Sequence, residues 1–162
     1  MAGKLVMLVA ASLVLHCCNY VYAMSLTEPN QVIHVTGKVL CQDCSQSYNE
    51  WIHGAKPIKG CRVSLTCMDQ RKRVMYYGSD ETDEEGQFDL TVDKYTDPNF
   101  CFARLLYSPD PTCNVMTNFG GGQYGVKLLR PTAIYRDVIN YMIGPFYYTS
   151  PMCEKPDITG SD

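Results

Sequence analysis

The chain has 162 residues, and its 14 lysines and arginines against 17 aspartates and glutamates give a formal net charge of −3. This mild and scattered negative charge argues against nucleic acids and anionic membranes as partners. The length suits a single folded domain rather than several.

The first segment in chain order has the pattern of a secretory signal peptide. A lysine precedes an apolar run from Leu5 to Leu15, and Ala23 ends a small-residue cleavage site. The run is too short to span a bilayer, which takes about 20 residues, and no later run approaches that length. We predict cleavage between Ala23 and Met24, so that residues 1–23 are the signal peptide and residues 24–162 are one secreted domain.

Short runs with β-branched and aromatic residues at alternating positions then predict an all-β domain. The run from Cys61 to Cys67 alternates cleanly and places its two cysteines, a valine and a leucine on one face. Turn residues separate the runs, as in the acidic turn that ends at Gly86. About seven short strands favour a β-sandwich or barrel. The expected strands cover residues 32–40, 61–67, 74–78, 87–92, 100–107, 125–129 and 145–149.

Two segments fit no strand pattern. Residues 118–123 contain three consecutive glycines and are expected to form a loop, because no Gly-Lys-Ser/Thr follows that would indicate phosphate binding. Apolar residues from Ile134 to Met142 fit a helical stripe that begins near Pro131. Residues 132–143 are therefore open to a short helix or a strand.

Seven cysteines lie downstream of the predicted cleavage site and indicate a disulfide framework in a secreted protein. Because seven is odd, one cysteine is either free or bonded to another molecule. Cys41-x-x-Cys44 also fits a redox motif or a zinc ligand pair, but no helix pattern follows and an oxidising compartment favours disulfides. The seven are Cys41, Cys44, Cys61, Cys67, Cys101, Cys113 and Cys153.

The other polar residues suggest no catalytic or metal site. His34 and His53 lack the serine or cysteine partner of a catalytic triad. The acidic run 80–85 lacks a calcium-loop pattern and is interpreted as a solvated turn. The abundant tyrosines are expected to pack along strands, with a sugar- or peptide-binding face as the alternative. We predict no catalytic residue, no metal and no cofactor.

Five short motifs follow one another across residues 32–153, which make up most of the predicted secreted domain. In order and spacing they resemble the olive-pollen major allergen and extensin-like family of plant secreted proteins. Several of them also resemble transthyretin-like modules, which implies a β-sandwich. The motifs are VTGKV (35–39), PIKGCRVSLTC (57–67), TDEEGQF (82–88), CFARL (101–105) and GPFYY (144–148).

The family resemblance implies three disulfides and leaves Cys61 unpaired. The family usually has a small residue such as alanine at this position, so the simplest interpretation of Cys61 is a buried small side chain. A dimer linked through Cys61 is the alternative, and the oligomeric state is left open. The implied pairs are Cys41–Cys113, Cys44–Cys153 and Cys67–Cys101.

The resemblance also implies a non-enzymatic protein of the extracellular space or plant cell wall. It would bind wall polysaccharide or extracellular proteins, in the growth of pollen, root or other tissue. A loop between the second cysteine and the next strand carries the first candidate binding residues, Tyr48, Trp51 and His53. A secreted signalling ligand for a cell-surface receptor is the alternative function, followed by a secreted hydrolase or thiol oxidoreductase.

Overall fold

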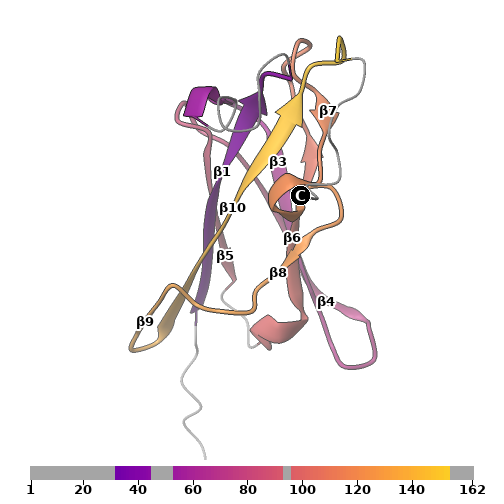
Figure 1. The fold of residues 1–162 in the computed structure, drawn as a ribbon. Coiled ribbons are helices and arrows are strands. Elements are labelled where there is room, and N and C mark those ends of the chain that lie inside the picture. The colour runs from indigo at the N-terminus through magenta and orange to yellow at the C-terminus, as the bar shows by residue number, and fades with distance from the viewer. Residues whose placement is uncertain (1–31, 45–52, 93–95, 154–162) are drawn as a thin grey trace, which may run out of the picture. The chain divides into compact units, whose positions relative to one another are not determined.

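The computed structural model describes residues 32–44, 53–92 and 96–153, which belong to one compact unit, Gln31–Asp162. They form two β-sheets that face each other across a shared apolar core (Figure 1). The predicted disulfide-stapled all-β fold is confirmed. In chain order the elements are β1 (Val32–Gln42), β2 (Lys56–Pro57), β3 (Arg62–Met68), β4 (Val74–Glu81), β5 (Gln87–Val92), η1 (Pro98–Phe100), β6 (Cys101–Tyr107), β7 (Val115–Met116), η2 (Phe119–Gly121), β8 (Val126–Lys127), β9 (Ala133–Tyr135) and β10 (Val138–Thr149).

All seven expected strands are present in the described part of the chain, and β2, β7 and β9 are short additions. The segment 132–143 forms β9 and the first half of β10, so it is a strand hairpin and not a helix. No helix among the described residues is long and apolar enough to cross a membrane. The predicted signal peptide, with its cleavage site at Ala23 and Met24, lies outside the described residues.

The first sheet is built around the parallel pair of β1 and β10 (Figure 1). Their register begins with Val32 opposite Val138 and ends with Gln42 opposite Thr149. Strands β5 and β2 pair with successive parts of the free edge of β1, while β9 and β7 do the same along β10. Two parallel strands need a crossover connection between them. The second sheet is formed by residues of that connection.

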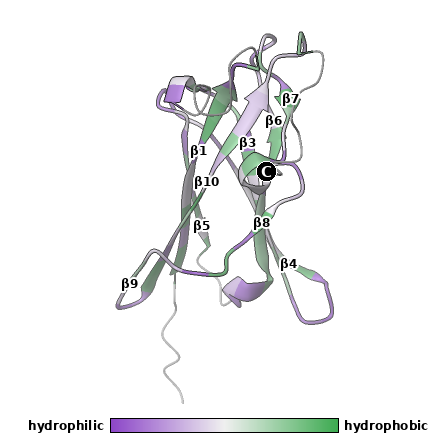
Figure 2. Ribbon diagram, viewed as in Figure 1, coloured by the Kyte–Doolittle hydropathy of each residue, from purple (hydrophilic) through white to green (hydrophobic). Residues whose placement is uncertain are grey.

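The second sheet is antiparallel and has the strand order β4-β3-β6-β8. On β3, the side chains of Val63, Leu65 and Cys67 have no exposed surface and face the core. The intervening residues, such as Thr66, therefore lie on the opposite, outer face. Figure 2 shows hydrophobic residues recurring along the strands and hydrophilic residues in the turn between β3 and β4.

Aromatic side chains from the first sheet fill much of the core. The rings of Phe88 on β5 and Phe146 on β10 are stacked, with centroids 6.0 Å apart. Both side chains are at most 2% exposed. Burying a phenylalanine side chain contributes about 1.5–3 kcal/mol relative to leaving it in water. The burial of this stacked pair explains why the TDEEGQF and GPFYY motifs each contain a phenylalanine.

The threonine of the TDEEGQF motif anchors the loop that precedes β3. The buried Thr82 hydroxyl donates a hydrogen bond to the Ile58 carbonyl oxygen at 2.6 Å. The Thr82 hydroxyl oxygen in turn accepts a hydrogen bond from the Cys61 amide at 2.9 Å. One side chain therefore satisfies two backbone groups that belong to buried residues.

The next residues of the motif form the turn itself. The Asp83 carboxylate accepts hydrogen bonds from the backbone amides of Glu85 and Gln87, at 3.0 and 2.7 Å. Gly86 has a φ of +70°, and a Cβ at this position would lie 2.6 Å from the Val39 carbonyl oxygen. The turn therefore requires glycine both for its backbone conformation and for the close approach to β1.

Three disulfides hold the fold together, and they are the pairs that the family resemblance implies. One joins directly opposed residues of β3 and β6, while two tie the end of β1 to later parts of the chain. In the chain-entropy model, loops of 34, 72 and 109 residues each correspond to about 4–5 kcal/mol. The disulfides are Cys41–Cys113, Cys44–Cys153 and Cys67–Cys101.

Candidate functional site

The acidic run 80–85 covers the end of β4 and the turn to β5, and its side chains form local contacts. Glu81 pairs with Arg62 of β3, and Glu84 pairs with Lys59. Asp83 accepts the turn amides described above. Within the described ranges, no group of three or more histidine, cysteine, aspartate or glutamate side chains is arranged to hold a metal ion. These contacts give the acidic run a structural role at the turn.

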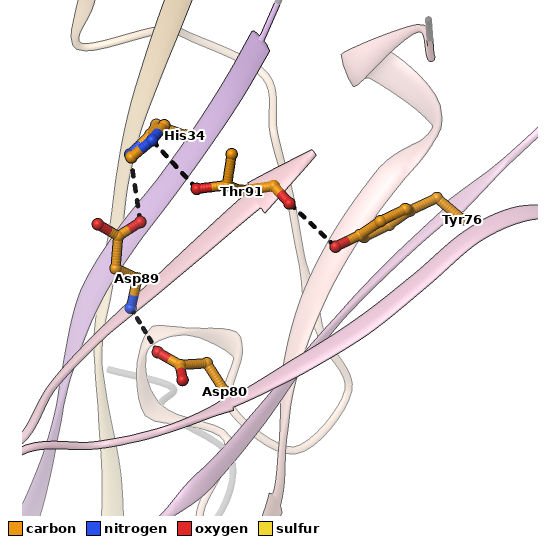
Figure 3. A network of polar contacts seen from close by, with 5 residues as sticks. All are labelled: His34, Tyr76, Asp80, Asp89 and Thr91. Carbon is orange, nitrogen blue, oxygen red and sulfur yellow. Dashed lines mark hydrogen bonds and ion pairs between the residues drawn. The ribbon is translucent and has the colours of Figure 1, made fainter. Parts of the chain in front are cut away.

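A polar network joins the edges of the two sheets (Figure 3). His34 Nδ1 lies 3.2 Å from Asp89 Oδ1, and His34 Nε2 lies 3.1 Å from Thr91 Oγ1. The Asp89 amide donates to the Asp80 carboxylate at 2.9 Å, and the Tyr76 hydroxyl donates to the Thr91 carbonyl at 3.1 Å. Side chains of β4 thus satisfy backbone groups on the open edge of β5, which protects that edge.

The order of contacts in this network, aspartate to histidine to hydroxyl, also occurs in hydrolase triads. A hydrolase additionally needs free backbone donors for the oxyanion of its reaction intermediate. The edge amide of Asp89 is already bonded to Asp80. The arrangement therefore fits a structural link between the two sheets better than a catalytic centre. We call this link the polar clasp, and it consists of His34, Tyr76, Asp80, Asp89 and Thr91.

Cys61 is the one described cysteine without a disulfide, and its side chain has no exposed surface. Burial raises the pKa of the Cys61 thiol, although polar interactions with the Ser108 and Thr82 side chains oppose this shift. A protonated, inaccessible thiol is a poor nucleophile and cannot reach a second chain. The structure therefore favours the buried small side chain over the dimer linked through Cys61.

Of the predicted binding loop, Tyr48 and Trp51 lie outside the described residues. His53 is exposed and precedes β2, which pairs with the end of β1 in the first sheet. The loop therefore stays a prediction.

The outer face of the second sheet brings together aromatic and cationic residues that the sequence analysis does not connect. The strand register places Tyr77 and Phe102 on either side of Thr66, and Lys127 beside Phe102. Directly opposed residues in a sheet share one face. A row of four side chains therefore crosses all four strands, over about 14 Å at the usual strand spacing.

Two further rows extend this surface. In the register, Arg104 lies opposite Ser64, and Tyr107 lies opposite Arg62. The side chains of Tyr77 and Tyr107 are 60% and 58% exposed. We define the outer face by five residues of these rows. They are Tyr77, Phe102, Arg104, Tyr107 and Lys127.

The cations of the outer face differ in their partners. Arg62, at its margin, is neutralised by Glu81. Neither Arg104 nor Lys127 forms an ion pair with a carboxylate of the described residues. Two exposed positive charges on the outer face are thus left without a described counterion.

A pocket of about 400 Å³ continues the outer face toward the turn between β3 and β4. The carboxylate in its wall, Asp69, bonds to the amide and side chain of Arg73, and these contacts lower the pKa of Asp69. Phe102 and Lys127 belong to both the outer face and the pocket. The lining residues are Met68, Asp69, Gln70, Lys72, Asn99, Phe100, Cys101, Phe102 and Lys127.

A second pocket, of about 220 Å³, lies on the first sheet between β1 and β10. Its wall includes the apolar residues Leu40, Met142 and Pro145, and Met142 is 71% exposed. This wall offers fewer polar groups for orienting a hydrophilic ligand than the pocket beside the outer face. The outer face is therefore the stronger candidate for a binding site.

Chemically, the outer face suits a flat and hydroxylated ligand. Tyrosine and phenylalanine rings provide rigid area for stacking, and tyrosine hydroxyls add hydrogen-bonding groups. Arg104 and Lys127 add donors and positive charge. The strands hold these side chains on a sheet that the Cys67–Cys101 disulfide staples. This combination makes the outer face a candidate binding surface for a carbohydrate or a peptide.

No protein-family model matches the chain, but individual relatives do. The pistil-specific extensin-like protein of Nicotiana tabacum is 34% identical over 139 residues, which cover 75% of this chain and 32% of that protein. The non-classical arabinogalactan protein 30 of Arabidopsis thaliana is 32% identical over 136 residues, covering 76% of this chain and 55% of that protein. The chain thus spans about a third to a half of the length of these curated relatives.

A solved structure supports the same relationship. The crystal structure of the major plantain pollen allergen Pla l 1 matches 75% of this chain and 99% of its own, with 28% identity and a TM-score of 0.55. The fold and the relatives define a disulfide-bonded plant protein of the pollen-allergen and cell-wall type. The chain belongs to the pollen allergen and extensin-like family, as the sequence motifs predict. These relatives are named as extensin-like, arabinogalactan and pollen-allergen proteins.

Proposed function

We propose that the chain is a non-enzymatic, secreted protein of the plant cell wall that binds wall polysaccharide through the outer face. The row from Tyr77 to Lys127 carries this proposal, because it presents exposed rings and polar groups on a stapled sheet. The names of the extensin-like and arabinogalactan relatives support an extracellular location. The predicted signal peptide, residues 1–23, supports secretion.

The physical basis of binding is stacking on a pre-organised surface. The C–H face of a sugar ring can lie on an aromatic ring while its hydroxyls bond to tyrosine and amide groups at the rim. Because strand pairing already fixes the backbone, no backbone freedom of these strands has to be lost when a polysaccharide binds. A row of about 14 Å accommodates more than one sugar ring, so the surface suits a polymer.

The test is retention of the purified, disulfide-bonded protein in gels that contain defined wall polysaccharides. Tyr77→Ala and Tyr107→Ala should each weaken binding at least tenfold, or about 1.4 kcal/mol, as expected for tyrosines at a binding surface. Tyr135→Ala is the matched control, because Tyr135 is 68% exposed on β9 of the other sheet. Its binding should equal that of the unmodified chain.

The proposal fails if the unmodified chain is retained by none of the polysaccharides. It also fails if the Tyr77 and Tyr107 variants bind as well as the Tyr135 variant. Saturable binding to plant plasma membranes without any polysaccharide binding would instead support the signalling-ligand alternative.

A further inference from the structure

We infer that the polysaccharide bound at the outer face is acidic, with carboxylates along the polymer as in a chain of uronic acid residues. This inference rests on the proposed function and names the ligand class of the same site. It starts from the charges around the outer face. The chain as a whole is negative, with a formal charge of −3, yet this surface carries unneutralised cations.

The cations outnumber the carboxylates that could neutralise them. Glu81 is used by Arg62, and Asp69 is used by Arg73. At the outer face and in the pocket wall, two lysines and one arginine have no carboxylate partner among the described residues. They are Arg104 on β6, Lys127 on β8 and Lys72 in the pocket wall.

The positions of these cations match the shape of a uronate ring. Lys127 lies directly across from Phe102 on the neighbouring strand, which places their Cβ atoms about 5 Å apart. Arg104 lies two residues along β6 on the same face, about 7 Å from Phe102. A sugar ring stacked on Phe102 would therefore direct a carboxylate at its edge toward either cation. The arginine fork matches a carboxylate with two parallel hydrogen bonds.

The pocket extends the same pattern beyond the sheet. Lys72 and Lys127 line it together with the exposed ring of Phe100 and the amide side chains of Gln70 and Asn99. Amides bond to sugar hydroxyls, and the lysines supply positive charge for a further carboxylate. One acidic chain could thus contact the outer face and the pocket in succession.

The test compares binding of the full secreted chain to polygalacturonate, to fully methyl-esterified polygalacturonate, and to poly-glutamate. The first probe has both rings and charge, the second has rings only, and the third has charge only. We expect binding to polygalacturonate to be at least tenfold tighter than to either control probe. It should weaken by about tenfold or more between low salt and 1 M NaCl, where screening shortens the range of charge interactions to about 3 Å.

Two matched charge variants locate the effect. Arg104→Gln/Lys127→Gln should weaken binding to polygalacturonate at least tenfold and leave binding to the methyl ester unchanged. Lys38→Gln/Lys56→Gln removes the same charge from exposed positions on β1 and β2 of the other sheet, and should bind like the unmodified chain.

Each other outcome refutes a defined claim. If the methyl ester or a neutral wall polysaccharide binds as tightly as polygalacturonate, and Arg104→Gln/Lys127→Gln has no effect, the acidic ligand is wrong but the proposed function stands. If poly-glutamate binds as tightly as polygalacturonate, the binding is explained by charge attraction alone, and the claim that the outer face recognises uronate rings is wrong. If no polysaccharide binds, both this inference and the proposed function are wrong.

Discussion

The Thr82 hydroxyl offers a direct test of how the turn motif stabilises the fold. Thr82→Val keeps the shape of the side chain but removes the hydroxyl that bonds to the Ile58 carbonyl and the Cys61 amide. Thr82 is 3% exposed, and Ile58 and Cys61 are also buried. Each buried polar group left without a partner costs about 1–3 kcal/mol, so the two groups together should cost about 2–6 kcal/mol.

A loss of this size is a large part of the total stability of a small domain, which is typically about 5–15 kcal/mol. It is measured as the free energy of unfolding in urea with the disulfides intact. Thr82→Ser is the control, because it keeps the hydroxyl and removes one methyl group, at a cost of about 0.8 kcal/mol. If the valine variant is no less stable than the serine variant, the two hydrogen bonds do not hold this loop.

Three further predictions follow from the fold. Replacing both Cys67 and Cys101 by alanine opens a 34-residue loop and should lower the free energy of unfolding by about 4 kcal/mol in urea titration, whereas a loss under 1 kcal/mol would contradict the chain-entropy argument. Gly86→Ala should lower the thermal midpoint by more than a surface substitution does, because the φ of +70° and the Val39 carbonyl both oppose a Cβ. The buried thiol of Cys61 should resist alkylation until the chain unfolds. Because the pKa of Cys61 is raised in the folded state, the thiol of the unfolded chain loses its proton first as the pH rises. The free energy of unfolding should therefore fall above pH 9.0, and it should fall less in Cys61→Ala.

The polar clasp explains how the open edge of the first sheet is kept from pairing with other chains. An edge strand presents free amides and carbonyls that can template aggregation. Here Asp80 and Tyr76 of β4 occupy such groups on β5, and His34 bonds to the side chains of Asp89 and Thr91 on the same strand (Figure 3). The clasp also joins two sheets that share no backbone ladder among the described residues.

The sequence by itself determined the features that depend on neighbouring residues. Alternation between Cys61 and Cys67 fixed the inner face of β3, and the glycine at position 86 marked the turn before β5. These signals are local because strand alternation and turn geometry involve residues only two to four positions apart. The cysteine pairs followed from the family resemblance, since spacing alone allows many connectivities.

Only the tertiary structure decided the features that depend on distant residues. The segment with the helical stripe from Ile134 to Met142 is extended instead, because its second part pairs with β1 at the other end of the described chain and its first part, β9, pairs with β10. The tertiary structure also decides which tyrosines are buried: Tyr148 is packed in the core, whereas Tyr77 faces solvent. The outer face itself arises from register across four strands, which no local pattern encodes. Long-range pairing decides which side chains meet, and so it also decides which residues form the candidate binding surface.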